Sequence, residues 1–284
     1  MTSFPRRPVS LAASPPVSRV ELAPGYSIAR VINGCWQLSH GHGGNTESAG
    51  PLMSRLSSLV EAGYTTFDCA DIDTGVESLL GRFLKGLGEP ERVQVHTKFV
   101  PDLDGLNELD RAKIEAVIHR SLRRLGVERL DLVQFHWWDY AIPGYLEALA
   151  VLDELRAAGK IRLLGLTNFD GRRVSEFLDS GVSIASLQLQ YSLLDRRPEK
   201  AVSELCRSHG IQLLAYGALA GGLLSGQQLG RPSMQGDNRS LQKYRLMVNE
   251  AGGWDRYQVL LSVLADIARG LGVSIPAVAM RWVL

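Results

Sequence analysis

The chain has 284 residues, of which 45% are hydrophobic and 21% are charged, and its formal net charge is +1. This composition is that of an ordinary globular protein with a sizeable core. A charge so close to zero gives no broad field that would attract nucleic acid, and no apolar run is long enough to span a bilayer. The three cysteines, Cys35, Cys69 and Cys206, are too widely spaced for a disulfide framework or a CxxC metal pair, so a reducing compartment is expected.

The N-terminal segment differs from the rest of the chain. Three arginines, four prolines and several serines fall within residues 1–19, and no acidic residue precedes Glu21. This pattern fits a disordered tail or a short organelle transit peptide. We favour the tail, because the segment is short and lacks an amphipathic helical pattern. We therefore expect a cytoplasmic protein, with an organelle as the alternative if residues 1–20 are a transit peptide.

Beyond the tail, β-rich runs alternate with helical patterns. Residues 20–22 and 27–31 flank Pro24-Gly25, which predicts a hairpin with a tight turn. The strands that follow are expected at residues 30–34, 65–69, 93–98, 130–136, 161–166, 185–189 and 211–216. Helices are expected at residues 52–62, 77–85, 111–125, 145–158 and 199–209. Each of these helical patterns is followed by a glycine, which ends a helix in the left-handed conformation, and the alternation predicts a parallel sheet.

The predicted fold class is α/β, a (β/α)8 TIM barrel with an N-terminal β-hairpin over residues 20–284. No G-x-G-x-x-G follows the first strand, so a doubly wound dinucleotide fold is disfavoured. After the seventh strand the chain runs through a polar stretch, residues 225–253, and ends in helical patterns at 257–271 and 275–284. Because a barrel needs closure, we expect the chain to lack the last strand and helix, or another element to fill the gap.

Charged and polar side chains stand where successive strands end. Asp68 lies near the end of the second strand, Lys98 at the end of the third and His136 at the end of the fourth. Taken alone, each also has a purely structural interpretation. Lys98 could be a solvated strand end, Asp68 its ion-pair partner, and His136 a hydrogen-bonded rim residue. Active sites of such barrels lie at the carboxyl ends of the strands, where these three side chains would converge. Together they favour a functional site.

The order of motifs from about Val31 to the last residue resembles the aldo-keto reductase family. These motifs are Asn33-Gly34-Cys35-Trp36, Phe67-Asp68-Cys69-Ala70-Asp71, Thr97-Lys98, the run from Asp131 to Trp137, the run from Gly165 to Phe169, residues 188–192, and the run from Ala215 to Leu219. The resemblance implies a barrel enzyme that transfers a hydride from NADPH to a small aldehyde or ketone. The choice of NADP over NAD rests on the resemblance alone. The family binds the 2′-phosphate with residues that follow the eighth strand, and no eighth strand is predicted in this sequence.

The resemblance also implies roles for individual residues. Catalytic roles fall on Asp68, Lys98 and His136, with Asp73 at the fourth position. Cofactor contacts fall on Asp68, Thr167, Asn168, Gln188, Tyr216, Gly217, Leu219 and Gly221. Trp36, Trp137 and Tyr140 would line the substrate mouth. No metal is implied, no nucleic-acid or membrane partner is expected, and the sequence leaves the substrate and the oligomeric state open.

One position departs from the family pattern. Asp73 stands where the family has the tyrosine that protonates the carbonyl oxygen. A carboxyl with its ordinary pKa is ionised at neutral pH, and we expect Lys98 to keep Asp73 ionised and to form an ion pair with it in competition with Asp68. Loss of a general acid typically lowers the rate by about 10²–10⁴-fold. We therefore expect cofactor binding to survive and turnover to be weak, unless His136 supplies the proton.

Two other functions fit parts of the pattern. A non-catalytic nucleotide-binding or interaction module on the same scaffold would explain both Asp73 and the missing end. A metal-dependent hydrolase would use Asp68, Asp73 and His136 as ligands. The hydrolase is disfavoured, because Lys98 beside these ligands would repel a cation and the cofactor motifs would go unexplained.

Overall fold

A computed structural model describes residues 17–40, 49–234 and 239–284 of the chain. Apart from residues 17–19, the predicted N-terminal tail lies outside the described residues. Among the described residues no single helix is long and apolar enough to cross a membrane; the pair Gly253–Leu271 and Ile275–Val283 passes the same test of length and composition when taken together, bent by 98°.

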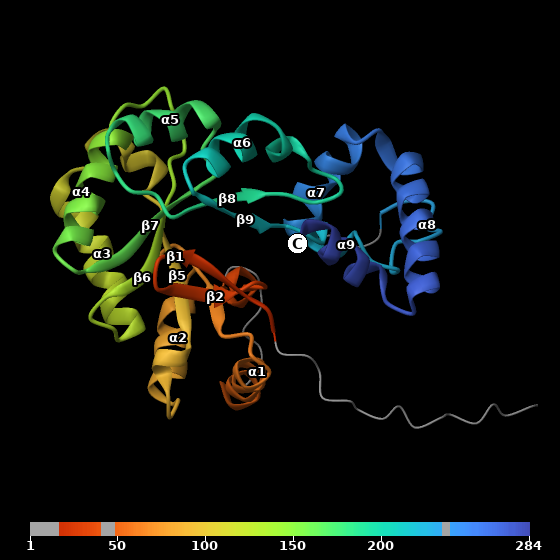
Figure 1. Cartoon of the computed structure of the whole chain (residues 1–284), viewed down its shortest axis with the longest axis horizontal. Helices are drawn as coiled ribbons and strands as arrows, with labels where there is room; N and C mark the ends of the chain where they lie inside the picture. Colours follow the sequence, from red (N-terminus) through yellow and green to blue (C-terminus); the bar gives the residue numbers. More distant parts are fainter. Residues whose placement is uncertain (1–16, 41–48, 235–238) are drawn as a thin grey trace, which may run out of the picture.

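Seven parallel strands form one curled sheet in chain order, as the sequence predicts (Figure 1). They are β3 (Asn33–Gly34), β4 (Thr66–Asp68), β5 (Gln94–Phe99), β6 (Leu130–Phe135), β7 (Ile161–Thr167), β8 (Ser186–Gln190) and β9 (Gln212–Tyr216). Among the described residues β3 and β9 each pair with one neighbour, so the sheet is an open part of a barrel. The predicted barrel architecture is confirmed in this open form.

Helices cover the outer face of the sheet. Each connection between consecutive strands contains one α-helix, and several connections also contain a short 3-10 turn. The helices are α1 (Ala49–Glu61), α2 (Val76–Lys85), α3 (Arg111–Leu125), α4 (Tyr145–Ala157), α5 (Gly171–Asp179) and α6 (Ala201–Ser208), and the 3-10 turns are η1 (Trp36–Leu38), η3 (Pro90–Arg92), η4 (Leu103–Glu108), η5 (Arg197–Glu199) and η6 (Ala220–Gly222). In α3 the Asp110 carboxylate accepts the Lys113 N–H at 2.8 Å, and Gly126 ends the helix at φ 70°.

Successive side chains of the strands alternate between two regions, the hydrophobic core beneath the helices and the inside of the curled sheet. Phe67, Phe99 and Phe135 point outward and join the main hydrophobic core beneath the helices. Their neighbours Asp68 and Lys98 point to the inside of the curled sheet, where they contact each other. A strand places successive side chains on opposite faces, so each apolar anchor presents a polar residue to the inside.

The hairpin of β1 (Arg19–Ala23) and β2 (Tyr26–Ala29) covers the end of the sheet where the strands begin. Its buried residues Leu22, Tyr26 and Ile28 pack with Leu132 of β6. The Tyr26 hydroxyl lies 3.2 Å from Nε2 of the buried His96. The predicted hairpin is thus confirmed, and it leaves the carboxyl ends of the strands free to form a site.

Three helices follow β9 and form a second core. They are α7 (Arg239–Glu250), α8 (Gly253–Leu271) and α9 (Ile275–Val283), and Figure 1 shows them gathered beside β9, away from α3 and α4. Tyr257, Leu261 and Leu264 of α8 pack there against Leu223 and Leu224, which follow η6. This packing holds the segment after β9 against the sheet.

Two helices were not predicted from the sequence. Helix α5 buries only Val174 and Phe177, too few apolar positions for a clear helical period. Helix α7 lies in the polar stretch 225–253 and buries a thin stripe of Leu241, Tyr244 and Val248. The predicted helix at 199–209 divides into η5 and α6, and the first predicted strand, 30–34, is reduced to β3.

A close approach between α2 and α3 yields a prediction. A Cβ at Gly81 would overlap the carbonyl oxygen of Arg124. We expect Gly81→Ala to lower the free energy of unfolding by about 1–3 kcal/mol, because a methyl group forces the packed helices apart. Urea denaturation followed by circular dichroism measures this, with Gly88→Ala, where a Cβ meets nothing within 4 Å, as the control. Equal stability of the two variants would contradict the prediction.

Candidate functional site at the carboxyl ends of the strands

A largely buried ion pair stands at the centre of the candidate site. Lys98 Nζ lies 2.6 Å from Asp68 Oδ2 and donates a second hydrogen bond to the Cys69 carbonyl at 2.9 Å. The two side chains are only 15% and 16% exposed. Asp68 Oδ1 accepts from Gln134 Nε2 at 2.6 Å and from Gln188 Nε2 at 3.1 Å. The carboxylate is therefore held by donors from β5, β6 and β8.

His136 follows directly after β6 and lies beside this pair. Its Nδ1 is 3.2 Å from the Thr167 carbonyl oxygen. A carbonyl only accepts, so Nδ1 carries a proton and, in the neutral ring, Nε2 carries none. Burial lowers the pKa of His136, which the charge of Lys98 reinforces. The imidazole is thus neutral at pH 7, with a bare Nε2.

Asp73 lies in the turn between β4 and α2, is 8% exposed, and does not take the partner expected for it. Among the described residues its carboxylate forms no ion pair, because Lys98 is paired with Asp68. The expected Asp73–Lys98 ion pair is therefore wrong. Burial raises the pKa of Asp73 to about 6, against the lowering effect of Lys98 and with a further rise from Asp68. Desolvation outweighs the lysine, the reverse of the sequence expectation.

The turn that carries Asp73 is fixed by a second polar network. Asp71 Oδ1 accepts the Val100 N–H at 3.1 Å. Arg124 of α3 donates to the Asp71 carbonyl at 3.0 Å and to Glu77 Oε2 at 3.2 Å. Because Asp71 and Glu77 are buried, these contacts tie the turn to β5 and to α3. The position of Asp73 is set by the packed helices.

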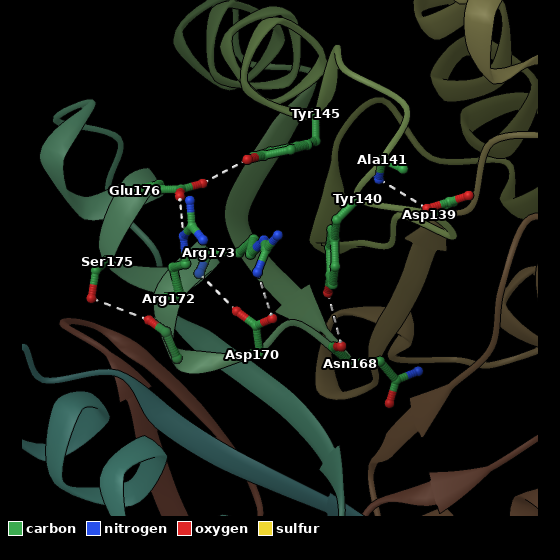
Figure 2. Close-up of polar contacts among 11 residues, drawn as sticks. Asp139, Tyr140, Ala141, Tyr145, Asn168, Asp170, Arg172, Arg173, Ser175 and Glu176 are labelled. Carbon is green, nitrogen blue, oxygen red and sulfur yellow. Dashed lines mark hydrogen bonds and ion pairs between the residues drawn. The ribbon is translucent and has the colours of Figure 1, made fainter.

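A second group of candidate residues gathers at the rim around Asn168, and Figure 2 shows Asn168 with Tyr140 and the neighbouring Arg173. Asn168 has a left-handed backbone, with φ 62°. Its carbonyl accepts from the Tyr140 hydroxyl at 3.3 Å, and its Oδ1 accepts from the Tyr216 hydroxyl at 2.9 Å. Its N–H donates to the Gln188 carbonyl at 2.9 Å, while the Arg173 guanidinium lies 4.4 Å from the centre of the Tyr140 ring. Asn168 thus links three predicted site residues.

The segment after β9 forms a tight turn that includes the candidates Gly217, Leu219 and Gly221. Gly217 adopts φ 70°, and a Cβ there would overlap the Tyr244 hydroxyl of α7. The N–H groups of Ala218 and Leu219 donate to no protein acceptor within the described part of the chain. Backbone donors without protein partners at such a turn are suited to an anion.

The two tryptophans after His136 lie differently from what the sequence suggested. Trp137, proposed for the substrate mouth, is 2% exposed, and its Nε1 donates to the Asp139 and Ile142 carbonyls. Trp138 is 48% exposed, and its ring meets the His136 ring edge-on with centroids 4.5 Å apart. The exposed ring beside the site is therefore Trp138.

Two polar residues of the site received no role from the sequence. Gln134 holds Asp68, and the signal for it was a polar residue two positions before His136, hence on the same face of β6. Lys243 of α7 lies 4.7 Å from the centre of the Tyr216 ring, and no motif marked it. Trp36, also proposed for the mouth, is 38% exposed in η1. Within the described ranges no three His, Cys, Asp or Glu side chains are placed to hold a metal ion.

Comparison with known proteins identifies the family. The model of the Aldo/keto reductase family matches residues 30–284. The chain belongs to the aldo/keto reductase family. It is 31% identical to flagellar radial spoke protein 5 of Chlamydomonas reinhardtii, over 81% of this chain and 56% of that protein. It is 28% identical to the NADH-specific methylglyoxal reductase of Escherichia coli, over 91% of this chain and 82% of that enzyme.

A solved structure agrees with the family and the fold. The glycerol dehydrogenase of Gluconobacter oxydans superposes with a TM-score of 0.76 at 26% identity, covering 91% of this chain and 80% of that one. The chain therefore spans about half the length of the radial spoke protein and about four fifths of the two enzymes. The family model and the solved structure thus agree on the barrel scaffold of this chain.

The buried ion pair yields a prediction on stability. Lys98→Met leaves the Asp68 carboxylate buried with two amide donors and no cation, so we expect the free energy of unfolding to fall by about 3 kcal/mol. Adding Asp68→Asn to this variant removes the uncompensated charge and should restore part of the loss. Urea denaturation at pH 7.5 measures both. A double variant no more stable than Lys98→Met would contradict the assigned cause.

Proposed function

We propose that this chain binds NADPH and reduces a small aldehyde or ketone to the alcohol, with a rate limited at neutral pH by Asp73. The observation that carries the proposal is the convergence of the Lys98–Asp68 pair, His136 and the Asn168 rim at the carboxyl ends of the strands. The enzymes to which the chain is similar, a methylglyoxal reductase and a glycerol dehydrogenase, act on small carbonyl compounds or alcohols.

The rim residues fit a nicotinamide dinucleotide. Asn168 uses its Oδ1 for Tyr216, and its Nδ2 donates to no protein acceptor among the described residues, which leaves a donor for the carboxamide. Thr167 and Gln188 flank it, and the Tyr216 ring offers a face for stacking. The free N–H groups after Gly217 suit the diphosphate. The bound dinucleotide would supply the hydride.

Asp73 is the side chain we propose as proton donor to the carbonyl oxygen. His136 is less suited, because its Nε2 carries no proton when the ring is neutral and burial lowers its pKa. Lys98 is already engaged by Asp68 and by the Cys69 carbonyl. As a hydride reaches the carbonyl carbon, Asp73 would give its proton to the oxygen and regain one from water. Lys98 would offset the charge left on the carboxylate.

The choice of NADPH over NADH is proposed from the family resemblance. One similar enzyme is NADH-specific by name, so titration with each nucleotide in turn decides the question. We also propose a cytoplasmic location, which fits three buried free cysteines. Imaging of the full chain with a C-terminal fluorescent tag tests this, and import into an organelle would instead favour the transit-peptide interpretation of residues 1–20.

The raised pKa of Asp73 predicts an acid-favoured rate. With a pKa of about 6, roughly a tenth of Asp73 is protonated at pH 7 and most of it at pH 5. We expect single-turnover oxidation of NADPH by 4-nitrobenzaldehyde to accelerate about ten-fold between pH 7 and pH 5. Stopped-flow absorbance at the NADPH band measures this, corrected for acid decay of NADPH without protein.

Two variants serve as controls for this prediction. Asp73→Asn cannot donate a carboxyl proton and should be slow at both pH values. Asp73→Tyr should be faster than wild type at pH 7, with no rise near pH 6. Wild-type turnover equal to that of Asp73→Tyr at pH 7 would contradict the proposed limitation. Tight NADPH binding with no turnover at either pH would favour a non-catalytic nucleotide-binding module, the alternative that a mostly ionised Asp73 supports.

Asp73 also predicts a pH-dependent stability. Its pKa in the folded chain, about 6, lies above its ordinary value, so folding disfavours the ionised form, and the penalty is full above pH 6 and fades as the pH falls toward 3.8. We expect Asp73→Asn to raise the free energy of unfolding by about 1–3 kcal/mol at pH 7.5 and by less at pH 4.5. Urea denaturation at the two pH values tests this. Asp104→Asn, at an exposed position, is the control, and equal effects of the two substitutions would contradict the prediction.

A further inference from the structure

We infer that Lys243 of α7 binds the diphosphate of the dinucleotide, an inference that rests on the dinucleotide binding proposed above. Lys243 Nζ lies 4.7 Å from the centre of the Tyr216 ring, 5.6 Å from that of Tyr244, and 3.4 Å from the Tyr216 hydroxyl. The ammonium thus stands over the residue proposed to stack the nicotinamide. It is held there by two aromatic rings.

The charge of Lys243 has no carboxylate partner in the part of the chain that the structure describes. The nearby cation Arg197 differs, because its Nε and NH2 groups donate to both oxygens of Asp195 at 2.8 and 2.6 Å. Arg197 is therefore neutralised, whereas Lys243 forms no such ion pair; burial lowers the pKa of Lys243, and the charge of Asp195 partly opposes this. A cation held by two aromatic faces and one hydroxyl, with no carboxylate, remains available to an anion.

The same part of α7 is packed against the turn that offers the free backbone donors. Tyr244, the next residue, contacts Gly217 so closely that no side chain fits there. The Ala218 and Leu219 N–H groups of this turn have no protein acceptor among the described residues. This packed contact thus ties the helix that carries Lys243 to the turn that carries the two N–H groups. A diphosphate is an anion that takes both kinds of donor.

A matched pair of substitutions on one helix tests this role. Lys243 and Arg245 are both exposed cations of α7 two residues apart, so Arg245 faces another side of the helix. We expect Lys243→Met to weaken both NADPH and NADH about 10-fold in fluorescence titrations, because one charge-assisted contact is lost. Arg245→Met should change either affinity less than about two-fold. Lys243→Arg should retain most of the affinity.

The outcomes separate this inference from the proposed function. A wild-type chain that binds either nucleotide, with Lys243→Met binding equally well, overturns the inference and leaves the proposed function standing. Loss of NADPH affinity alone, with NADH unchanged, also overturns it, because the 2′-phosphate would then be the partner. If wild type binds neither nucleotide, the proposed function fails, and calorimetric titration with inorganic pyrophosphate decides the inference. Pyrophosphate binding to wild type but not to Lys243→Met supports it, and no binding to wild type overturns it.

Discussion

The buried Lys98–Asp68 pair is the constraint on which the inner face of the sheet depends. Removing two charges from water costs several kcal/mol each, and their attraction offsets this only when the remaining lone pairs and protons find partners. Asp68 meets that condition with Gln134 and Gln188, and Lys98 meets it with the Cys69 carbonyl. Strands β5, β6 and β8 must therefore each place a polar side chain inward at one level. The site is polar because the pair requires it.

The same pair explains why Asp73 behaves unlike an ordinary aspartate. A nearby cation should favour the ionised form of a carboxyl. Lys98, however, makes its short contact with Asp68 and donates its two hydrogen bonds to Asp68 and to the Cys69 carbonyl. Asp73 therefore receives only part of the lysine's effect, together with repulsion from Asp68 and the full effect of burial. A second carboxyl placed beside a satisfied pair favours its neutral form. This gives the site a carboxyl that titrates close to physiological pH.

Most of the fold could be predicted because its signals are local and repeated. Glycines end the periodic helical patterns, and apolar runs lie between these patterns, so the seven strands could be predicted in their order. The ends of the predicted strands then pointed to Asp68, Lys98 and His136. Side-chain direction could not be predicted in the same way. Trp137 and Trp138 are adjacent and identical, and only packing against the Phe135 cluster decides which is buried. Lys243 belongs to a polar helix whose place is set by Tyr244 meeting Gly217, a contact between distant residues.

The two proposed tasks of the site, dinucleotide binding and proton supply, lie in different parts of the structure. The proposed binding of a dinucleotide would depend on the rim, where Asn168, Tyr216 and the turn after Gly217 are fixed by backbone conformation and by α7. The proposed proton supply would depend on the turn after β4, which Asp71, Glu77 and Arg124 tie to the helices. Asp68 lies between these two regions, since it contacts Lys98 on one side and Gln188 on the other. A change at position 73 therefore alters the chemistry while the rim keeps its geometry, because no hydrogen bond among the described residues joins the Asp73 side chain to the rim.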